Sequence, residues 1–145
     1  PHPEAQGLEK ELRGRCLHNH ITTATRETAL SRFKALKAGE NFHDLSPELK
    51  TTYSNAERTQ NTIYMRLKYD EPSGTVVNVR KSMWIHPELD RAISIREAAR
   101  LQTFPDSFIF EGTKDSQYQQ VGNAVPPFLA KAVAESIISI LDQVQ

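Results

Sequence analysis

Apolar residues recur at helical spacing near the end of the chain. They fall at intervals of four residues, and the other face of the same stretch is charged and polar. This spacing predicts an amphipathic helix from about Pro127 to Gln143 that packs on a large apolar surface. Its stripe consists of Leu129, Val133, Ile137 and Leu141, widened by Phe128, Ala132, Ile140 and Val144.

Two further helices are predicted upstream. Residues 95–103 follow a capping box, in which Ser94 caps the third amide and Glu97 reaches back. Residues 25–38 have helical periodicity, and Gly39 closes that helix. The inner face of the second helix carries Leu30, Phe33 and Leu36 with the stem of Lys37, and its basic residues Arg26, Arg32 and Lys34 are expected at the surface.

The middle of the chain has β-prone runs. Segments 63–67 and 75–79 are separated by the turn-forming residues 70–74, a pattern that favours a hairpin or neighbouring strands. Residues 84–87 read as a short extended piece stopped by proline. Ser46 and Pro47 are typical of the first positions of a short helix. The elements together predict a mixed α/β (α+β) fold with short strands and helices.

Composition fits one ordinary globular domain. The chain has 145 residues, of which 38% are hydrophobic and 25% charged. It has no apolar run of about 18 residues, so no transmembrane helix and no membrane partner are expected. The first residues lack the apolar centre of a signal peptide. A single cysteine, Cys16, excludes an internal disulfide and suits a reducing compartment, so a cytoplasmic location is expected.

Charge is unevenly distributed although the net charge is zero. Residues 10–37 hold seven Lys and Arg against two acidic residues, and residues 50–81 hold six against three. From residue 92 onward the balance is acidic. A local basic excess can meet DNA phosphates, although dispersed Lys and Arg are more often plain solvated surface.

Two strings near the end of the chain carry chemistry. Residues 92–106 contain Arg96, Glu97 and Arg100 followed by Phe-Pro-Asp, and residues 117–127 contain Gly-Asn, a small residue and valine. In this order and at this spacing they resemble the last two sequence blocks of the DNA (cytosine-5)-methyltransferases. The resemblance extends upstream to residue 62 and, more loosely, over residues 16–49.

The resemblance implies a division of the chain. Residues 1–91 would form a small target-recognition domain that binds double-stranded DNA, and residues 92–116 would support it. Residues 117–145 would return to the cofactor side, where the last helix docks on a Rossmann-like methyltransferase domain. Arg96 and Arg100 would then serve as scaffold, without reading bases.

The resemblance also suggests site residues. Asn123 and Ala124 would border the cofactor S-adenosylmethionine, since Gly122 permits a close backbone approach and the Asn123 amide can donate and accept. The residues expected to contact DNA are Thr75, Asn78, Arg80, Lys81 and Ser82. An exposed basic loop is the plainer alternative for these five.

The catalytic residues of that family are missing. Its nucleophile is a cysteine in a Pro-Cys motif, whose thiolate attacks a flipped-out cytosine. Cys16 follows Arg15 and lies upstream of the recognition region, and Glu40-Asn41-Phe42 only approximates the family's Glu-Asn-Val. No glycine-rich cofactor loop is present. We therefore expect the C-terminal part of such an enzyme, either a fragment or one half of a split one. It would have no catalytic residue of its own and a missing N-terminal catalytic part as its partner.

Other interpretations remain open. The chain could be a non-catalytic DNA-binding or regulatory module derived from such an enzyme. Cys16, His18 and His20 share one face of a predicted extended segment, but no fourth zinc ligand is evident, so no metal site is assigned. Without its usual partner, the last helix is expected to mediate self-association.

Overall fold

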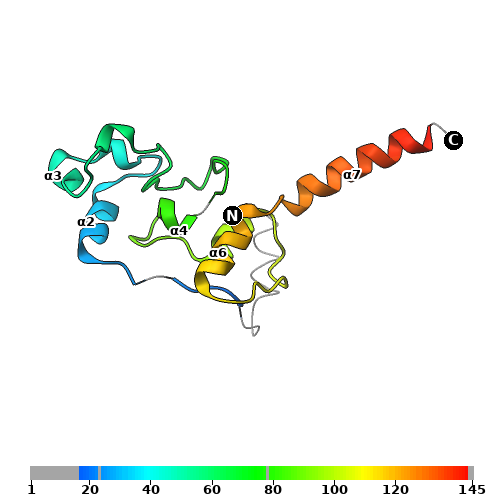
Figure 1. The fold of residues 1–145 in the computed structure, drawn as a ribbon, viewed down its shortest axis with the longest axis horizontal. Helices are drawn as coiled ribbons and strands as arrows, with labels where there is room; N and C mark the ends of the chain where they lie inside the picture. Colours follow the sequence, from blue (N-terminus) through cyan, green and yellow to red (C-terminus); the bar gives the residue numbers. More distant parts are fainter. Residues whose placement is uncertain (1–16, 23, 78, 144–145) are drawn as a thin grey trace.

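The computed structural model describes residues 17–22, 24–77 and 79–143. Figure 1 shows α2 and α3 at one end of the molecule, α6 near its middle and α7 projecting from the other end. The chain also contains two 3₁₀-helical turns, Phe42–Asp44 and Ala56–Arg58. The helices are α2 (Glu27–Ala35), α3 (Pro47–Lys50), α4 (Val79–Ser82), α5 (Ile95–Leu101), α6 (Lys114–Asn123) and α7 (Pro127–Asp142).

The prediction of a mixed α/β fold with short strands is wrong. The described residues contain helices and no β-strand. The hairpin expected between residues 63–67 and 75–79 does not form, because the second run ends in the short helix α4. The backbone of residues 63–67 instead bonds to residues 82–85, where the amide of Ile85 donates to the carbonyl of Met65 at 2.9 Å.

Backbone geometry explains why this pairing stops at single bridges. Ile85 pairs with Arg66 in parallel and with Ala92 in antiparallel orientation, and both bridges are isolated. Tyr64 and Met83, which lie two residues before the bridged positions, have left-handed backbones with φ of 54° and 51°. A ladder needs consecutive extended residues, so a left-handed residue ends it. The β-prone side chains therefore fill the core without forming a sheet.

Two apolar clusters meet at Trp84 and Ile85, which are both fully buried. Consecutive residues of an extended segment point to opposite sides, so one segment serves both clusters. We call the first the α5–α6 core; it contains Val76, Trp84, Ile93, Ile95, Ala98, Ala99, Phe110, Tyr118 and Val121. The second, the α2 core, contains Ala29, Phe33, Leu36, Phe42, Leu45, Tyr64 and Ile85.

Arg66 ties the end of α2 to the α2 core. Its guanidinium donates to the carbonyls of Phe33 at 2.6 Å and Leu36 at 2.8 Å, and so satisfies acceptors that the end of a helix leaves open. The same group donates to the Asp90 carboxylate at 2.6 Å and to the His86 carbonyl at 2.9 Å. Because Arg66 is only 5% exposed, this carboxylate compensates a largely buried charge.

Asn19 connects distant parts of the chain. Its side-chain amide donates to the carbonyl of Phe110 at 2.7 Å and to the Gln117 side chain at 2.9 Å. Its side-chain oxygen accepts from the Phe110 amide at 3.0 Å and from Arg96 at 3.2 Å. Asn19 has a φ of 61°, a conformation that asparagine tolerates better than most residues. The segment before α2 is thereby fixed to α5 and α6.

Arg96 is the charged centre of this network, and its exposed fraction is 0%. Its guanidinium donates to the carbonyls of His18 and Pro105 at 3.0 Å each, and to the carbonyl of Phe108. Burial lowers the pKa of Arg96 below its ordinary value. Its charge is thus stabilised by backbone dipoles from three separate positions. We call Asn19, Arg96 and Gln117 the Asn19–Arg96 hub.

The helices predicted from periodicity and capping are confirmed, with shifted ends. Helix α7 ends one residue earlier than predicted, at Asp142. The Ser94–Glu97 capping box is present and starts α5, which ends at Leu101. Helix α2 is shorter than the predicted range 25–38, and Gly39 lies beyond it with a φ of 85°.

Helix α7 exposes its apolar stripe. None of its residues is buried, and Phe128 and Ile140 are 72% and 62% exposed. The stretch Lys114–Asp142 has the length and composition of a membrane-spanning helix. However, it consists of α6 and α7 with a break between them, and α7 alone has 16 residues. Such a helix is about 24 Å long, short of a hydrocarbon layer of about 30 Å.

The Glu97 side chain is held as a carboxylate at the start of α5. Burial would raise its pKa, but hydrogen bonds from Arg91 and the Ser94 amide, each 2.7 Å, outweigh burial. The pKa of Glu97 is therefore about 2, below its ordinary value of 4.5. The stabilisation is present above pH 4.5 and is lost as the pH falls through about 2.

We predict that Glu97→Gln lowers the free energy of unfolding at neutral pH and that this deficit shrinks in acid. Urea denaturation of both proteins at neutral pH and at about pH 3 measures the two differences. Glu111→Gln, which changes an exposed carboxylate, is the matched control and should have little effect at either pH. A Glu97→Gln deficit that is the same at both pH values would contradict the assigned role of the carboxylate.

Candidate functional site

The junction between α6 and α7 contains the predicted cofactor residues. Asn123 is the last residue of α6 and is exposed, and Ala124 is the C-cap and half-buried. Gly122 lies in the last turn of α6 with a helical backbone. Pro126 and Pro127 then start α7 without amide donors.

The end of α5 holds this junction in place. The Gln102 side-chain amide donates to the carbonyl of Val121 at 3.0 Å and to that of Ala124 at 3.4 Å. The hydroxyl of Thr103 accepts from the amide of Phe128 at 3.2 Å. Gln102 is 6% exposed, so these bonds are shielded from water. Two neighbouring residues thus fix both ends of the segment that joins α6 to α7.

A cavity of about 440 Å³ lies beside this junction. One side is formed by residues 73–76, part of the region predicted to face DNA, and the other by the α5 end, the junction and α7. The lining residues are Ser73, Gly74, Thr75, Val76, Leu101, Gln102, Gly122, Ala124, Pro126 and Leu129. The structure therefore brings one predicted DNA residue, Thr75, and one predicted cofactor residue, Ala124, to a single cavity.

The other predicted DNA residues differ in exposure. Lys81 is exposed on α4, while Ser82 is 3% exposed and its carbonyl accepts from the Tyr64 amide at 2.8 Å. Asn78 lies outside the described residues, and Arg80 is placed in α4 by its backbone alone. Thr75 and Lys81 are thus the members of this set whose described side chains face solvent.

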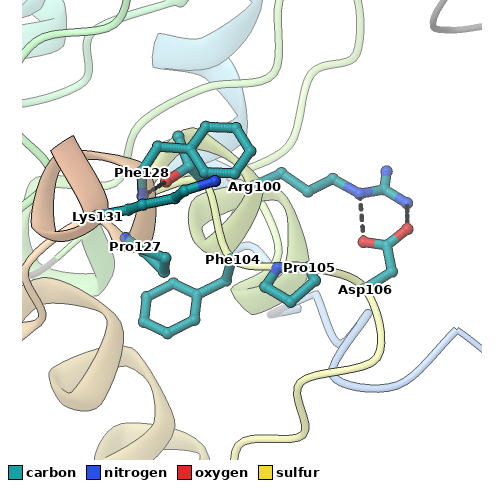
Figure 2. A pocket seen from close by; sticks show the side chains of 8 residues that line it. Arg100, Phe104, Pro105, Asp106, Pro127, Phe128 and Lys131 are labelled. Carbon is teal, nitrogen blue, oxygen red and sulfur yellow. Dashed lines mark hydrogen bonds and ion pairs between the residues drawn. The ribbon is translucent and has the colours of Figure 1, made fainter. Parts of the chain in front are cut away.

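A second, apolar cavity of about 540 Å³ lies between the loop after α5 and the start of α7. Figure 2 shows Phe104 and Pro105 on one side of it and Phe128 on α7 on the other. At its edge Arg100 donates twice to the Asp106 carboxylate, at 2.8 and 2.6 Å (Figure 2). The hydrogen bonds from Arg100 lower the pKa of Asp106. This geometry agrees with the predicted scaffold role of the arginines in this block.

Arg32 is a residue that sequence analysis placed wrongly. It was expected on the surface of its helix but is 4% exposed. Its guanidinium donates to the carbonyl of Leu49 at 2.7 Å and to the Tyr64 hydroxyl at 3.0 Å, and lies 5.2 Å from the centre of the Tyr53 ring. The available signal was the helical spacing: Arg32 lies next to Phe33 and three positions after Ala29, and all three side chains are buried on one face of α2.

The candidate zinc ligands have other contacts where they are described. His20 Nδ1 lies 3.0 Å from the Ser94 hydroxyl, and the His18 carbonyl accepts from Arg96. Cys16 lies outside the described residues. Among the residues that the structure describes, no group of three His, Cys, Asp or Glu side chains could hold a metal ion.

Comparison with known proteins identifies clear relatives. A family model described as C-5 cytosine-specific DNA methylase matches residues 4–139. The chain is 37% identical over 137 residues to the type II methyltransferase M.DdeI of Desulfomicrobium norvegicum, covering 84% of this chain and 32% of that protein. It is 37% identical over 142 residues to the type II methyltransferase M.AquIB of a Picosynechococcus species, covering 88% of this chain and 94% of that protein.

Among solved structures, the chain is similar to a DNA modification methyltransferase encoded within a prophage of E. coli. The TM-score is 0.66 at 26% sequence identity, over 94% of this chain and 33% of that one. The chain thus spans about a third of the length of M.DdeI and of the solved relative, and nearly all of M.AquIB.

Proposed function

The chain belongs to the C-5 cytosine-specific DNA methylase family, and from this membership we propose that it supplies DNA target recognition and one edge of the cofactor site to such an enzyme. The reaction transfers a methyl group from S-adenosylmethionine to C5 of cytosine in double-stranded DNA. We assign residues 1–91 to recognition, residues 92–116 to their support and residues 117–145 to the cofactor side. The proposed location is the cytoplasm, where the chain would meet its DNA.

The observation that carries this proposal is the 440 Å³ cavity between residues 73–76 and the α6–α7 junction. Its lining contains hydroxyl, amide and backbone groups and no ionisable side chain. S-adenosylmethionine carries a positive sulfonium, which a wall without cationic groups does not repel. Backbone at Gly122 and the polar side chain of Gln102 can border such a ligand. These residues fit one wall of a cofactor site, and the other wall would come from the catalytic part.

In this proposal the nucleophile comes from outside the chain. The family's chemistry requires a cysteine thiolate in a Pro-Cys motif, and the single cysteine here, Cys16, follows Arg15. A catalytic part, on the same protein or on a separate one, would provide the thiolate and the glycine-rich cofactor loop. The role of this chain is then to bind and orient the DNA and to close the cofactor site.

The extent of M.AquIB supports this division. A curated type II methyltransferase that aligns over 94% of its own length has nearly the same extent as this chain. The exposed stripe of α7 supports it as well, because a face of this size is covered in a working enzyme. We propose that the catalytic part covers it.

We predict that labelled methyl transfer to double-stranded DNA occurs only when the chain is combined with its catalytic part. The chain alone should show no transfer, since no thiolate is placed for attack. Cys16→Ala should leave the combined activity unchanged, which separates Cys16 from the nucleophile. DNA binding without transfer in either preparation would contradict this proposal and favour a non-catalytic DNA-binding module.

We predict that Lys81→Gln weakens DNA binding through a lost phosphate contact. The loss should be similar for different DNA sequences, and the slope of log affinity against log salt should fall by about 0.9. Lys34→Gln removes the same charge from an exposed position on α2 and is the matched control. Equal effects of the two substitutions would show that Lys81 contributes only general charge.

We predict that the chain without its catalytic part self-associates through α7. Sedimentation velocity over a range of concentrations should show an increasing mean mass, because an exposed apolar stripe is buried between copies. Ile137→Glu on the stripe should suppress this association, while Ser139→Glu on the other face of α7 should not. A monomer at all concentrations would count against the docking role of α7.

A further inference from the structure

Thr103 occupies a backbone position that normally belongs to glycine. Helix α5 ends in a Schellman motif, in which the amide of Phe104 donates to the carbonyl of Ala99 at 3.0 Å and the amide of Thr103 to that of Arg100 at 2.9 Å. Thr103 is the left-handed residue of this motif, with a φ of 61°. A β-branched residue is strained there, because its side chain crowds the backbone. Such strain persists where the side chain has a use.

The Thr103 side chain caps another helix, α7. Helix α7 begins with Pro126 and Pro127, which have no amide hydrogen, and its own N-cap makes no side-chain cap hydrogen bond. Phe128 is the first residue of α7 with an amide to satisfy, and it donates to the Thr103 hydroxyl at 3.2 Å. Glycine would remove the strain and also this acceptor.

Gln102 caps the opposite end of the same junction. The last carbonyls of a helix have no partner within it. The Gln102 amide donates to the carbonyls of Val121 and Ala124, at the end of α6, at 3.0 and 3.4 Å. Because Gln102 is 6% exposed, its bonds meet little competition from water. The end of α5 therefore caps α6 with one residue and α7 with the next.

We propose that Gln102 and Thr103 are positioning residues for the methyl donor. By holding both helix ends, they set the place of Gly122–Ala124 at the proposed cofactor edge and the place where α7 begins. Gln102 also lines the 440 Å³ cavity with Gly122 and Ala124. This inference rests on the proposed function, and it adds which residues outside the cavity wall hold the donor's edge of the site in place.

Variants of Thr103 test the proposal in the complex with the catalytic part. Thr103→Gly and Thr103→Val both lose the hydroxyl, and Thr103→Ser retains it. We expect the first two to raise KM for S-adenosylmethionine roughly three- to tenfold, the effect of one hydrogen bond, with KM for DNA within about twofold of wild type. Thr103→Ser should keep KM for S-adenosylmethionine near the wild-type value. Gln102→Met removes the side-chain amide at similar volume and should raise KM for S-adenosylmethionine as Thr103→Val does.

Two further readouts separate positioning from mere structural support. Calorimetric titration with S-adenosylhomocysteine, which binds without reacting, should show the same loss of affinity in Thr103→Gly and Thr103→Val. Thermal denaturation should find Thr103→Gly at least as stable as wild type, since glycine relieves the left-handed strain. A role in stability alone would instead lower the melting temperature and alter both KM values.

The outcomes distinguish this inference from the proposed function. An active wild-type complex whose donor affinity is unchanged by Thr103→Gly and Thr103→Val would overturn the positioning role alone. A parallel rise in KM for donor and DNA would overturn it too. A wild-type complex that transfers no methyl group would contradict the proposed function, and the positioning role would fall with it.

Discussion

The arrangement of the α5–α6 core depends on the burial of one guanidinium. Arg96 has an exposed fraction of 0%, and a buried charge without acceptors costs several kcal/mol, about 3–5 where a partner is removed. The N–H groups of its guanidinium therefore need the carbonyls of His18, Pro105 and Phe108 as acceptors, and this need fixes the positions of the three carbonyls. Asn19 extends the constraint to α6 through Gln117. Segments more than 70 positions apart along the chain are fixed by this single charge.

Helix α5 connects this constraint to the candidate site. Its first turn carries Arg96 and Glu97, and its end carries Gln102 and Thr103, which cap the helices on both sides of the junction. Residues 96–103 thus join the Asn19–Arg96 hub to the junction between α6 and α7, which is the proposed edge of the cofactor site. The exposed stripe of α7 begins beside this junction and is the surface proposed to dock on the catalytic part.

Local patterns predicted α5 and α7 because the causes of these two helices are local, whereas α4 and α6 were not predicted. The stripe of α7 and the Ser94–Glu97 capping box depend on residues three or four positions apart, and both are confirmed. The strands were predicted from side-chain preference, which left-handed backbones at Tyr64 and Met83 override. Within the site, the motif led to the junction that contains Asn123 and Ala124. The helical spacing of α2 could have indicated the burial of Arg32. It does not reveal the hydrogen-bond partners of Arg32 and Gln102, which lie 17 to 32 positions away along the chain.

Hydrogen exchange along the chain, measured alone at low concentration and again with the catalytic part, tests most directly whether the chain folds around the Asn19–Arg96 hub and presents α7 for docking. The amides of α5 and α6 should be protected in both states, because the hub is complete within the chain. Those of α7 should exchange quickly in the chain alone and slowly in the complex. Rapid exchange of α5 in the chain alone, or an α7 that gains no protection in the complex, would contradict this account.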